Sequence, residues 1–340
     1  MDNKIKIFIL KVLKYYTVVV LLSIVIYSFT RHNLIFDFTA KKFVTEFSKN
    51  NLAVNKEIAE ERRVVFQNVS QSKGKHFRYL IIGSSRVMQF GELIGFKNAL
   101  NLAVAGANLN DMKYIYNLAS RYNITYDTII FDFNPWLVIV NSDNRYKQFN
   151  SYQQLKYAIY DILRFNYNLE DLITLFGLLN NYALSFKIAS NKEIYNHTHH
   201  IKIKDGSIQL KKISPNERKK YIQSFVSRLY KMGNFYNIDT LLFKNTLDLY
   251  NSASTKGKCI ITLTPFHMDL YTKKKNDIRV KNMLIIEKKL INSEGNFQVY
   301  GSFNPYDISV LEADFADGIH LKGYANYKIF NHLSASSKSN

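Results

Sequence analysis

The sequence is poor in cysteine, proline and glycine: its 340 residues include 1 cysteine, 4 prolines and 13 glycines. The single cysteine, Cys259, excludes an internal disulfide, and its place in the apolar run 259–263 predicts a small buried side chain. So few turn-forming residues argue against an all-β sandwich, a collagen-like chain or a flexible linker. The hydrophobic share of 47% is sufficient for a core and argues against a disordered chain.

Acidic residues are also scarce, because 46 lysines and arginines face 27 aspartates and glutamates, which leaves a net charge of +19. Such an excess predicts an anionic partner, either nucleic acid or the surface of an anionic membrane or polysaccharide. The lysines are spread along the whole chain, without a dense basic block or a known nucleic-acid motif. We therefore expect a basic, solvated surface and no nucleic-acid partner.

A long uncharged run occurs near the N-terminus, over residues 15–29 (YYTVVVLLSIVIYSF). Extended back to residue 12, the run would form about 27 Å of helix at ~1.5 Å per residue, close to the ~30 Å of a bilayer core. A cleaved signal peptide would need small residues after the run, and residues 30–32 (TRH) do not supply them. We predict a membrane anchor over residues 1–32, with a signal peptide and a buried core helix as the alternatives.

The orientation of this anchor follows from the lysines that precede it. Four lysines come before the apolar run, at positions 4, 6, 11 and 14, whereas Arg31, Lys41 and Lys42 follow soon after it. The positive-inside rule narrowly favours a cytoplasmic N-terminus. We accordingly expect a single-pass protein of the cell membrane whose main domain lies outside the cytoplasm.

Short apolar runs that alternate with helical stretches predict an α/β domain. Alternation of this kind is typical of a three-layer sandwich, in which a central parallel sheet is covered by helices on both faces. The predicted strands are residues 79–82, 99–104, 128–133, 258–264 and 297–300. The predicted helices are residues 109–122, 225–253 and 282–290.

The remaining segments define the predicted domain organisation. A helical stalk is expected over residues 33–78, with helical spacing at 43–69, and a polar tail over residues 334–340. The α/β domain is expected over residues 79–333, with a mainly helical insertion at about 140–235. Within the insertion, residues 152–179 are predicted to be helical but carry too many charges for a second membrane span. Alternation around Asp205-Gly206 in residues 201–210 predicts a β-hairpin.

Polar residues follow the predicted strands, at the edge where an open parallel sheet binds ligands. Ser85 comes after the first strand, Gly106 after the second and Asn134 after the third. Asp317 and His320 lie in a late acidic and aromatic loop. A hydroxyl, a backbone amide, a carboxamide, a carboxylate and an imidazole are the groups that acyl transfer requires.

The order of these residues resembles the motif blocks of the SGNH (GDSL-type) hydrolase superfamily. Gly83-Ser84-Ser85 stands where that family has Gly-Asp-Ser, and Gly106 stands at the second block. The third block, Gly-x-Asn-Asp, keeps only Asn134, and the last block, Asp-x-x-His, is matched by Asp317 and His320. The resemblance covers about residues 79–330, apart from the insertion. It implies the SGNH fold, a flavodoxin-like α/β sandwich.

The resemblance also implies a role for each residue. Ser85 would attack an ester carbonyl, His320 would take its proton, and Asp317 would fix the imidazole tautomer. The backbone amides of Ser85 and Gly106 and the carboxamide of Asn134 would bind the oxyanion. No cofactor and no metal are implied.

Within the third block, two residues depart from the family pattern. Asp132 replaces the glycine, and Pro135 has no amide hydrogen to donate. The departures raise a question about the shape of the oxyanion loop, which the sequence leaves open.

The pattern looks closest to a membrane-anchored branch of the family, which includes proteins similar to those of alginate acetylation and teichoic-acid D-alanylation. This similarity implies a serine acyltransferase or esterase that acts on O-acyl groups, O-acetyl foremost, of a surface or exported polysaccharide. An acyl-donating membrane protein would be a further partner in the case of transfer. The alternatives are an inactive SGNH-like scaffold of a glycan assembly system and a basic protein associated with nucleic acid.

Each candidate residue also has a structural interpretation. Ser85, Gly106 and Asn134 are all compatible with turn or cap positions, and Asp317 and His320 with a surface loop. Arg86 would either hold an anionic substrate group or pair with a carboxylate, and the second is favoured. His267 would either line the pocket or be structural, and again the second is favoured. The run His197-Thr198-His199-His200 lacks companion ligands at metal spacing, so no zinc site is predicted.

Overall fold

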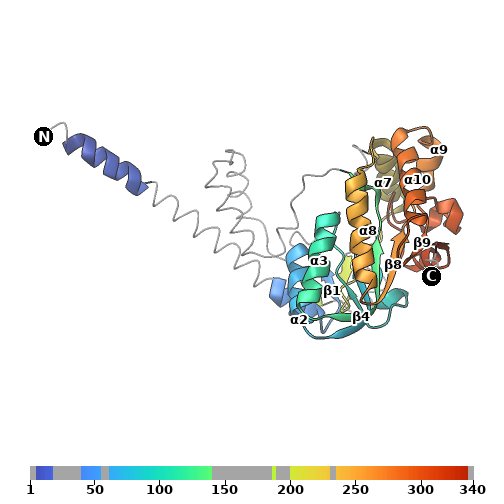
Figure 1. The fold of residues 1–340 in the computed structure, drawn as a ribbon, viewed down its shortest axis with the longest axis horizontal. Helices are drawn as coiled ribbons and strands as arrows, with labels where there is room; N and C mark the ends of the chain where they lie inside the picture. Colours follow the sequence, from blue (N-terminus) through green and yellow to red (C-terminus); the bar gives the residue numbers. More distant parts are fainter. Residues whose placement is uncertain are drawn as a thin grey trace.

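A computed structural model describes residues 5–17, 40–54, 61–139, 186–188, 200–229 and 235–335. These residues form an α/β domain with a six-stranded main sheet, and beside it a four-stranded antiparallel sheet (Figure 1). The predicted α/β class and the central parallel sheet flanked by helices are confirmed.

The main sheet has the strand order β10-β9-β8-β4-β2-β3, in which β10 alone runs antiparallel to its neighbour. Numbered along the chain, its five parallel strands lie in the order 2-1-3-4-5, which is the flavodoxin-like doubly wound arrangement. In that arrangement the topological switch point lies between β2 and β4. The strands are β2 (His76–Ile82), β3 (Ala99–Asn101), β4 (Thr125–Asp132), β8 (Lys258–Leu263), β9 (Phe297–Gly301) and β10 (Leu333–Ala335).

Alternation along the strands gives the sheet two apolar faces. Leu80 and Ile82 belong to the larger core, whereas Ile81 between them belongs to the smaller core on the reverse face. Cys259 is buried in the larger core, as predicted, and burial raises the pKa of its thiol. The larger core is covered by α2 (Glu61–Gln71), α3 (Leu109–Arg121), α8 (Thr240–Ser254) and α10 (Ile278–Ile291) (Figure 1). The reverse face is covered by α11 (Tyr327–Phe330), short 3-10 helices and loops.

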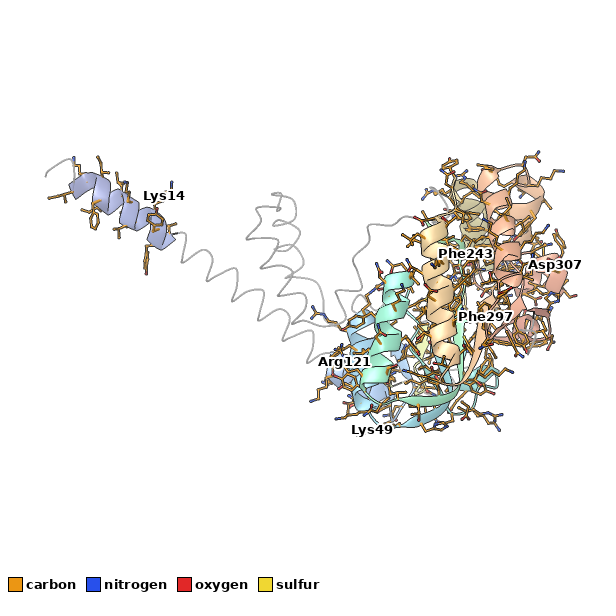
Figure 2. The ribbon with its side chains drawn as sticks, in the orientation of Figure 1. Lys14, Lys49, Arg121, Phe243, Phe297 and Asp307 are labelled. Atoms are coloured by element: carbon orange, nitrogen blue, oxygen red, sulfur yellow. The ribbon has the colours of Figure 1, made fainter. Side chains whose placement is uncertain are left out.

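Side chains fill the space between the covering helices and the sheet (Figure 2). Phe297 on β9 is buried against Tyr250 of α8, with ring centroids 6.0 Å apart, and Phe243 of α8 stacks edge-on against Phe133. Burying an aromatic side chain of this size contributes roughly 2–3 kcal/mol each. These contacts fix α8 along the sheet, from Phe133 after the carboxyl end of β4 to Phe297 at the start of β9.

The predicted helix over residues 225–253 is wrong, because the structure divides it. Helix α7 (Pro215–Arg228) begins at a capping box, in which Ser214 and Glu217 satisfy each other's backbone amides. It ends at Leu229, whose φ of 49° lies in the left-handed region. Helix α8 then starts anew behind Asp239, whose side chain caps the Leu242 amide.

The predicted continuous helix over residues 43–69 is also wrong. The structure has a helix over residues 40–47, then strand β1 (Leu52–Val54) of the antiparallel sheet, then α2. Helix α2 packs on α3, where Arg62 makes a buried two-pronged ion pair with Asp111, at 2.7 and 2.9 Å. The apolar spacing in this range therefore serves packing against the α/β domain, with Val65 and Val69 in its larger core.

The predicted hairpin over residues 201–210 is confirmed as strands β6 (His200–Lys202) and β7 (Ile208–Gln209), with Gly206 at a φ of 87° in the turn. The hairpin docks on the loop that follows β2, where the Ile208 amide donates to the Met88 carbonyl at 2.7 Å. Strand β5 (Phe186–Ile188) pairs with β1. The predicted helix 152–179 and most of the tail 334–340 lie outside the described residues.

At the N-terminus, residues 5–17 form a helix. The predicted membrane span over residues 12–29 falls mostly on residues 18–39, which lie outside the described ranges. In the described part of the chain, no helix combines the length and the apolar character that crossing a membrane requires. The anchor remains a prediction.

A buried carboxyl on α10 predicts how stability depends on pH. Glu287 is 6% exposed and accepts the Phe303 amide at 3.2 Å, and burial raises its pKa from 4.5 to about 7. A raised folded-state pKa favours the protonated form, so stability is fully present below pH 4.5 and declines as pH rises through 7. We expect Glu287→Gln to be more stable than wild type by about 2–3 kcal/mol at pH 8, and by much less at pH 5. Urea unfolding of both proteins at pH 5 and pH 8 measures the difference in stability. A difference of the same size at both pH values would contradict this prediction.

Candidate active site

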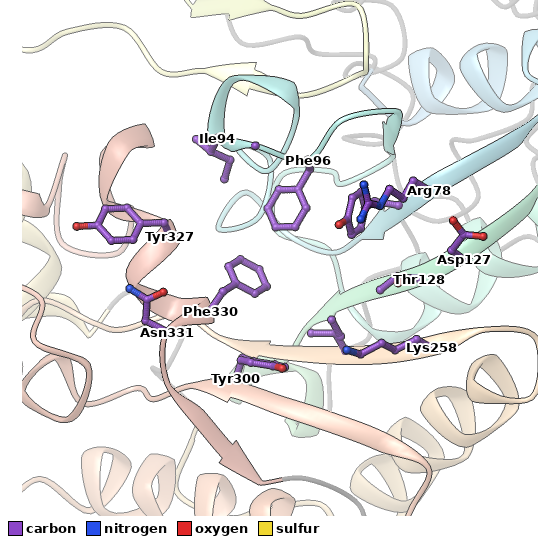
Figure 3. A pocket seen from close by; sticks show the side chains of 13 residues that line it. Arg78, Ile94, Phe96, Asp127, Thr128, Lys258, Tyr300, Tyr327, Phe330 and Asn331 are labelled. Carbon is purple, nitrogen blue, oxygen red and sulfur yellow. The ribbon is translucent and has the colours of Figure 1, made fainter.

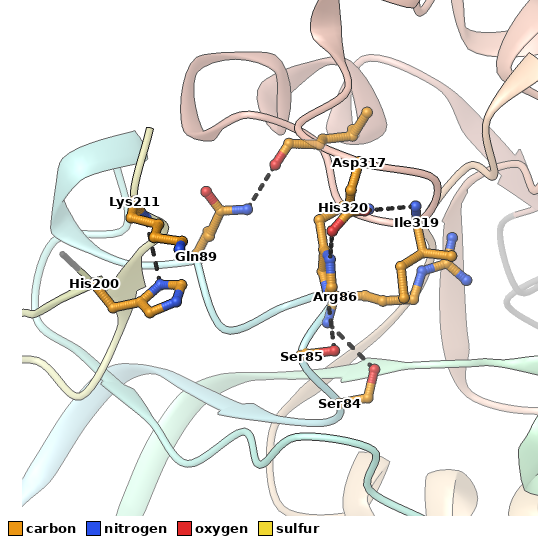
Figure 4. Close-up of polar contacts among 10 residues, drawn as sticks. Ser84, Ser85, Arg86, Gln89, His200, Lys211, Asp317, Ile319 and His320 are labelled. Atoms are coloured by element: carbon orange, nitrogen blue, oxygen red, sulfur yellow. Dashed lines mark hydrogen bonds and ion pairs between the residues drawn. The ribbon is translucent and has the colours of Figure 1, made fainter. Parts of the chain in front are cut away.

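Three residues predicted from the sequence meet at the carboxyl edge of the sheet (Figure 4). The Ser85 Oγ lies 2.9 Å from the His320 Nε2, and the His320 Nδ1 lies 2.7 Å from the Asp317 Oδ2. Ser85 follows β2, and the other two lie in the loop behind the 3-10 helix η6 (Glu312–Asp314). Residues separated by 235 positions in sequence are thus joined in one hydrogen-bonded chain.

The protonation pattern of this chain follows from the carboxylate at its end. Burial raises the pKa of Asp317, but the adjacent His320 ring and hydrogen bonds to the carboxylate outweigh burial and hold the pKa below its usual value. An ionised carboxylate only accepts, so the His320 Nδ1 donates to it and the Nε2 accepts from the Ser85 hydroxyl. The Asp317 Oδ1 is fixed by the amides of Ile319 and His320, both at 2.8 Å. This geometry allows the imidazole to act as a general base on Ser85.

Each residue of the Gly83-Ser84-Ser85 turn has its own role. A Cβ on Gly83 would lie 2.6 Å from the Val87 side chain and would collide with the Asp132 carboxylate. Ser84 is fully buried and donates to Asp132 twice, from its amide at 2.9 Å and from its hydroxyl at 2.5 Å. Ser85 is then left at the tip of the turn, facing His320. Asp132, which replaces a glycine of the family pattern, is the residue that holds this turn.

Arg86 points into the protein. Its side chain is buried, with its Nη1 donating to the Asn134 Oδ1 at 2.9 Å and its Nη2 donating to the carbonyls of Thr264 and Pro265. The guanidinium lies 4.0 Å from the centroid of the Phe266 ring. Burial lowers its pKa to about 9, against the opposing charge of Asp132. Arg86 therefore has the structural position that was favoured, although its direct partners are an amide and carbonyls rather than a carboxylate.

Asn134 lies inside the same network. Its side chain is fully buried, and its Nδ2 donates to the Ser84 Oγ at 3.1 Å and to the Asp132 carboxylate. Both amide hydrogens are thereby used, and the carbonyl oxygen accepts from Arg86. In this arrangement the carboxamide braces the turn, so an oxyanion role would require it to release these partners.

The other predicted oxyanion donors lie at the turn itself and beside it. The Ser85 amide has no hydrogen-bond partner among the described residues. Gly106 has a φ of 60°, in the left-handed region that favours glycine, and the nearby Val104 amide donates to the Gly83 carbonyl at 2.9 Å. The loop of Gly106 is therefore held next to the Gly83-Ser84-Ser85 turn, and the oxyanion role of its amide stays a prediction.

His267 lies beside the loop that carries Asp317 and His320 (residues 315–322, called the acid–base loop) without touching the three central residues. It caps helix α9 (Met268–Lys273), accepting the Asp269 amide on Nδ1 at 3.2 Å, and its own amide donates to the Gly318 carbonyl at 3.1 Å. The ring packs edge-on against Phe315, and burial lowers its pKa. These contacts fit the structural interpretation of His267.

The histidine run at residues 197–200 is only partly described. His200 starts β6, and its Nδ1 accepts the Lys211 amide at 3.3 Å (Figure 4). His197 and His199 lie outside the described residues. Across the described ranges, no three histidine, cysteine or acidic side chains are grouped as a metal site would require.

Two supports of the nucleophile turn were not predicted. Besides Asp132, the buried Asn101 at the end of β3 donates to the carbonyls of Val87 and Phe90, both at 2.8 Å, so it fixes the loop after Ser85. The sequence could have indicated the role of Asn101, because Asn101 is a polar residue within a predicted strand. The signal for Asp132 was its departure from the family pattern.

Helix α7 of the insertion packs directly on the acid–base loop. A Cβ on Gly318, between Asp317 and His320, would lie 2.5 Å from the Phe225 Cβ. We expect Gly318→Ala to displace the loop, at a cost of about 1–3 kcal/mol in stability, and to lower ester turnover at least tenfold. Adding Phe225→Gly should restore part of the turnover, because it removes both the colliding ring and the colliding Cβ. Equal turnover by Gly318→Ala and wild type in steady-state assays would contradict this.

A separate pocket lies at the other end of the sheet (Figure 3). It encloses about 580 Å³ and is lined by Arg78 and Lys258, on the amino-terminal halves of β2 and β8, and by the rings of Phe96, Tyr300 and Phe330. Its lining contains none of the residues of the candidate active site, which follows the carboxyl end of β2.

Comparison with known proteins adds no relative. No protein-family model matches the sequence, and no curated protein matches it. The functional conclusion therefore depends on the geometry of Ser85, His320 and Asp317.

Proposed function

We propose that this protein is a serine acyltransferase or esterase of the SGNH type. The observation that carries the proposal is the chain of hydrogen bonds from the Ser85 hydroxyl through His320 to Asp317, at 2.9 and 2.7 Å. The flavodoxin-like strand order, with Ser85 at the switch point between β2 and β4, supports it as well.

The reaction would proceed through an acyl-enzyme. The Ser85 Oγ attacks the ester carbonyl while its proton moves to the His320 Nε2, and Asp317 stabilises the imidazolium that forms. The Ser85 amide, which has no partner in the described part of the chain, would donate to the oxyanion together with the Gly106 amide. The imidazolium then returns its proton to the leaving alcohol. Water or a sugar hydroxyl attacks the acyl-enzyme to complete hydrolysis or transfer.

The proposed substrate is an O-acyl group, O-acetyl foremost, on a surface or exported polysaccharide. The net charge of +19 and the apolar run at residues 15–29 support a site on an anionic polymer at the outer face of a cell membrane. An acyl-donating membrane protein would supply the acyl group if the reaction is transfer.

The direct test is the time course of p-nitrophenol release from p-nitrophenyl acetate by the purified full-length chain. An acyl-enzyme mechanism predicts a burst equal to the enzyme concentration when deacylation is slower than acylation. Adding a neutral glycan as acyl acceptor distinguishes transfer from hydrolysis. Transfer yields acetylated sugar, whereas hydrolysis yields acetate. A folded chain that releases no nitrophenol above background would contradict the proposal.

The second candidate is an inactive scaffold of the same fold. The observation that favours it is the full burial of Asn134, whose amide hydrogens serve Ser84 and Asp132 instead of facing a substrate. A scaffold would bind a glycan without turnover, so absence of the burst together with measurable glycan binding would select it.

A further inference from the structure

Helix α7 turns one side toward the acid–base loop. Arg218, Ile222 and Phe225 are spaced at i, i+4 and i+7, which places them on one face of the helix. Phe225 packs on Gly318 and stacks on Phe266 with ring centroids 5.9 Å apart, and Ile222 is buried. Arg218 lies on the same face two turns before Phe225, and its charge acts on both His267 and Lys322.

A second cation comes from the loop itself. Lys322 follows His320 by two positions, and its amide donates to the Asp314 carbonyl at 2.7 Å. The side chains of Lys322 and Arg218 are both half-buried, and neither makes an ion pair with a described residue. Burial and the nearby positive charge of Arg218 both lower the pKa of Lys322, which indicates that the two cations lie within electrostatic range.

The acidic residues around these cations have other partners. Asp314 pairs with Lys328 at 2.7 Å, and Asp269 pairs with Lys273 at 2.7 Å. Asp317 is bound to His320. Glu312 is exposed, and its charge acts on His267. Two like charges are therefore held together beside the loop. Asp314, Asp269 and Asp317 each bind another side chain, and the charge of Asp314 also acts on Lys322.

A buried donor in the same region also lacks an acceptor. His267 is 1% exposed, and because its Nδ1 accepts the Asp269 amide, its Nε2 carries the hydrogen. That Nε2 has no hydrogen-bond partner among the described residues. Arg218 from α7, Lys273 and Asp269 from α9 and Glu312 from η6 are the charges that act on this ring. An unsatisfied buried donor is costly, so it needs an explanation such as a bound acceptor.

We infer that Arg218 and Lys322, with the His267 Nε2 as a neutral donor, form a subsite for an anionic group next to the acid–base loop. Its ligand would be a phosphate or carboxylate on the glycan whose acyl group reaches Ser85. Two cations and one neutral donor match the acceptor oxygens of such a group. The inference rests on the proposed function for its substrate, and the subsite itself can be tested without turnover.

The kinetic test compares three acetyl esters on the full-length chain: p-nitrophenyl acetate, 4-acetoxybenzoate and 4-acetoxyphenyl phosphate. For each anionic ester we take the ratio of its kcat/KM to that of the neutral ester. We expect Arg218→Gln and Lys322→Gln each to lower this ratio about tenfold. High salt should lower it in wild type. Lys219→Gln, an exposed lysine of the same helix, is the matched control and should keep the wild-type ratio. The ester with the larger loss identifies phosphate or carboxylate as the preferred group.

Equal ratios in wild type and in both variants would overturn the subsite, as would an equal loss in Lys219→Gln. If wild type hydrolyses none of the esters, the proposed function fails, and binding then decides the subsite alone. Polygalacturonate and polyphosphate serve as the carboxylate and phosphate probes in equilibrium titrations. Binding weakened about tenfold in Arg218→Gln and Lys322→Gln, but not in Lys219→Gln, would support the subsite; unchanged binding would overturn it.

Discussion

Replacing Ser85 with alanine is expected to lower the turnover of p-nitrophenyl acetate by at least about 10⁴-fold. The substitution removes the hydroxyl that lies within hydrogen-bond distance of the His320 ring, at an Oγ–Nε2 distance of 2.9 Å. His320 and Asp317 would keep their own hydrogen bond, so what remains is background hydrolysis. Initial rates of nitrophenol release, corrected for the uncatalysed reaction, measure the effect.

The matched control is Ser293→Ala. Ser293 donates to the Lys289 carbonyl at the exposed end of α10, just before the amino end of β9 and thus at the opposite edge of the sheet from Ser85. Its replacement should leave turnover within twofold of wild type. Turnover by Ser85→Ala within tenfold of wild type, with the control unchanged, would show that the hydroxyl is not the nucleophile.

Replacing Asp132 with asparagine is expected to destabilise the protein by about 3–5 kcal/mol, because the variant loses hydrogen bonds to a buried carboxylate and leaves the buried Arg86 cation without an opposing charge. Asp132 is fully buried, and it is the opposing charge that most offsets the burial of Arg86. It also accepts from Ser84 at 2.5 and 2.9 Å. Urea titration measures the free energy of unfolding. The dependence of that free energy on urea concentration should have the same slope in the variant and in wild type.

Two further variants separate the loss of this buried carboxylate from a general effect of losing an acidic residue. Asp127→Asn removes a carboxylate whose side chain is 62% exposed, and should change stability by less than about 0.5 kcal/mol. Adding Arg86→Met to Asp132→Asn removes the unpaired cation and should recover part of the loss. An Asp132→Asn variant as stable as Asp127→Asn would contradict the network described here.

The parallel sheet could be predicted because each of its strands is a short apolar run closed by polar or turn residues. Predicted strand 128–133 falls within one residue of the end of β4, and 258–264 within one residue of β8. Since parallel strands end at one edge, the residues after them could be expected to meet. Ser85 and His320 do meet there, 235 positions apart.

The rest depended on contacts that no local pattern contains. The break between α7 and α8 needs a left-handed residue at Leu229, which is not a residue type that predicts a helix end. Helix α2 is joined to α3 by the buried ion pair between Arg62 and Asp111, which lie 49 positions apart in the sequence. The commitment of Asn134 to Ser84 follows from Asp132 at a position where the family pattern has glycine. Each is a pairing between distant residues, and one sequence does not reveal such pairs.

The most direct test of the central claim is covalent labelling of the full-length protein with a fluorophosphonate, followed by mass spectrometry of its peptides. An activated serine reacts with this probe because a general base removes its proton. The account predicts a single labelled residue, Ser85, and loss of the label in His320→Ala. A folded wild-type protein that stays unlabelled, or carries the label on another serine, would contradict it.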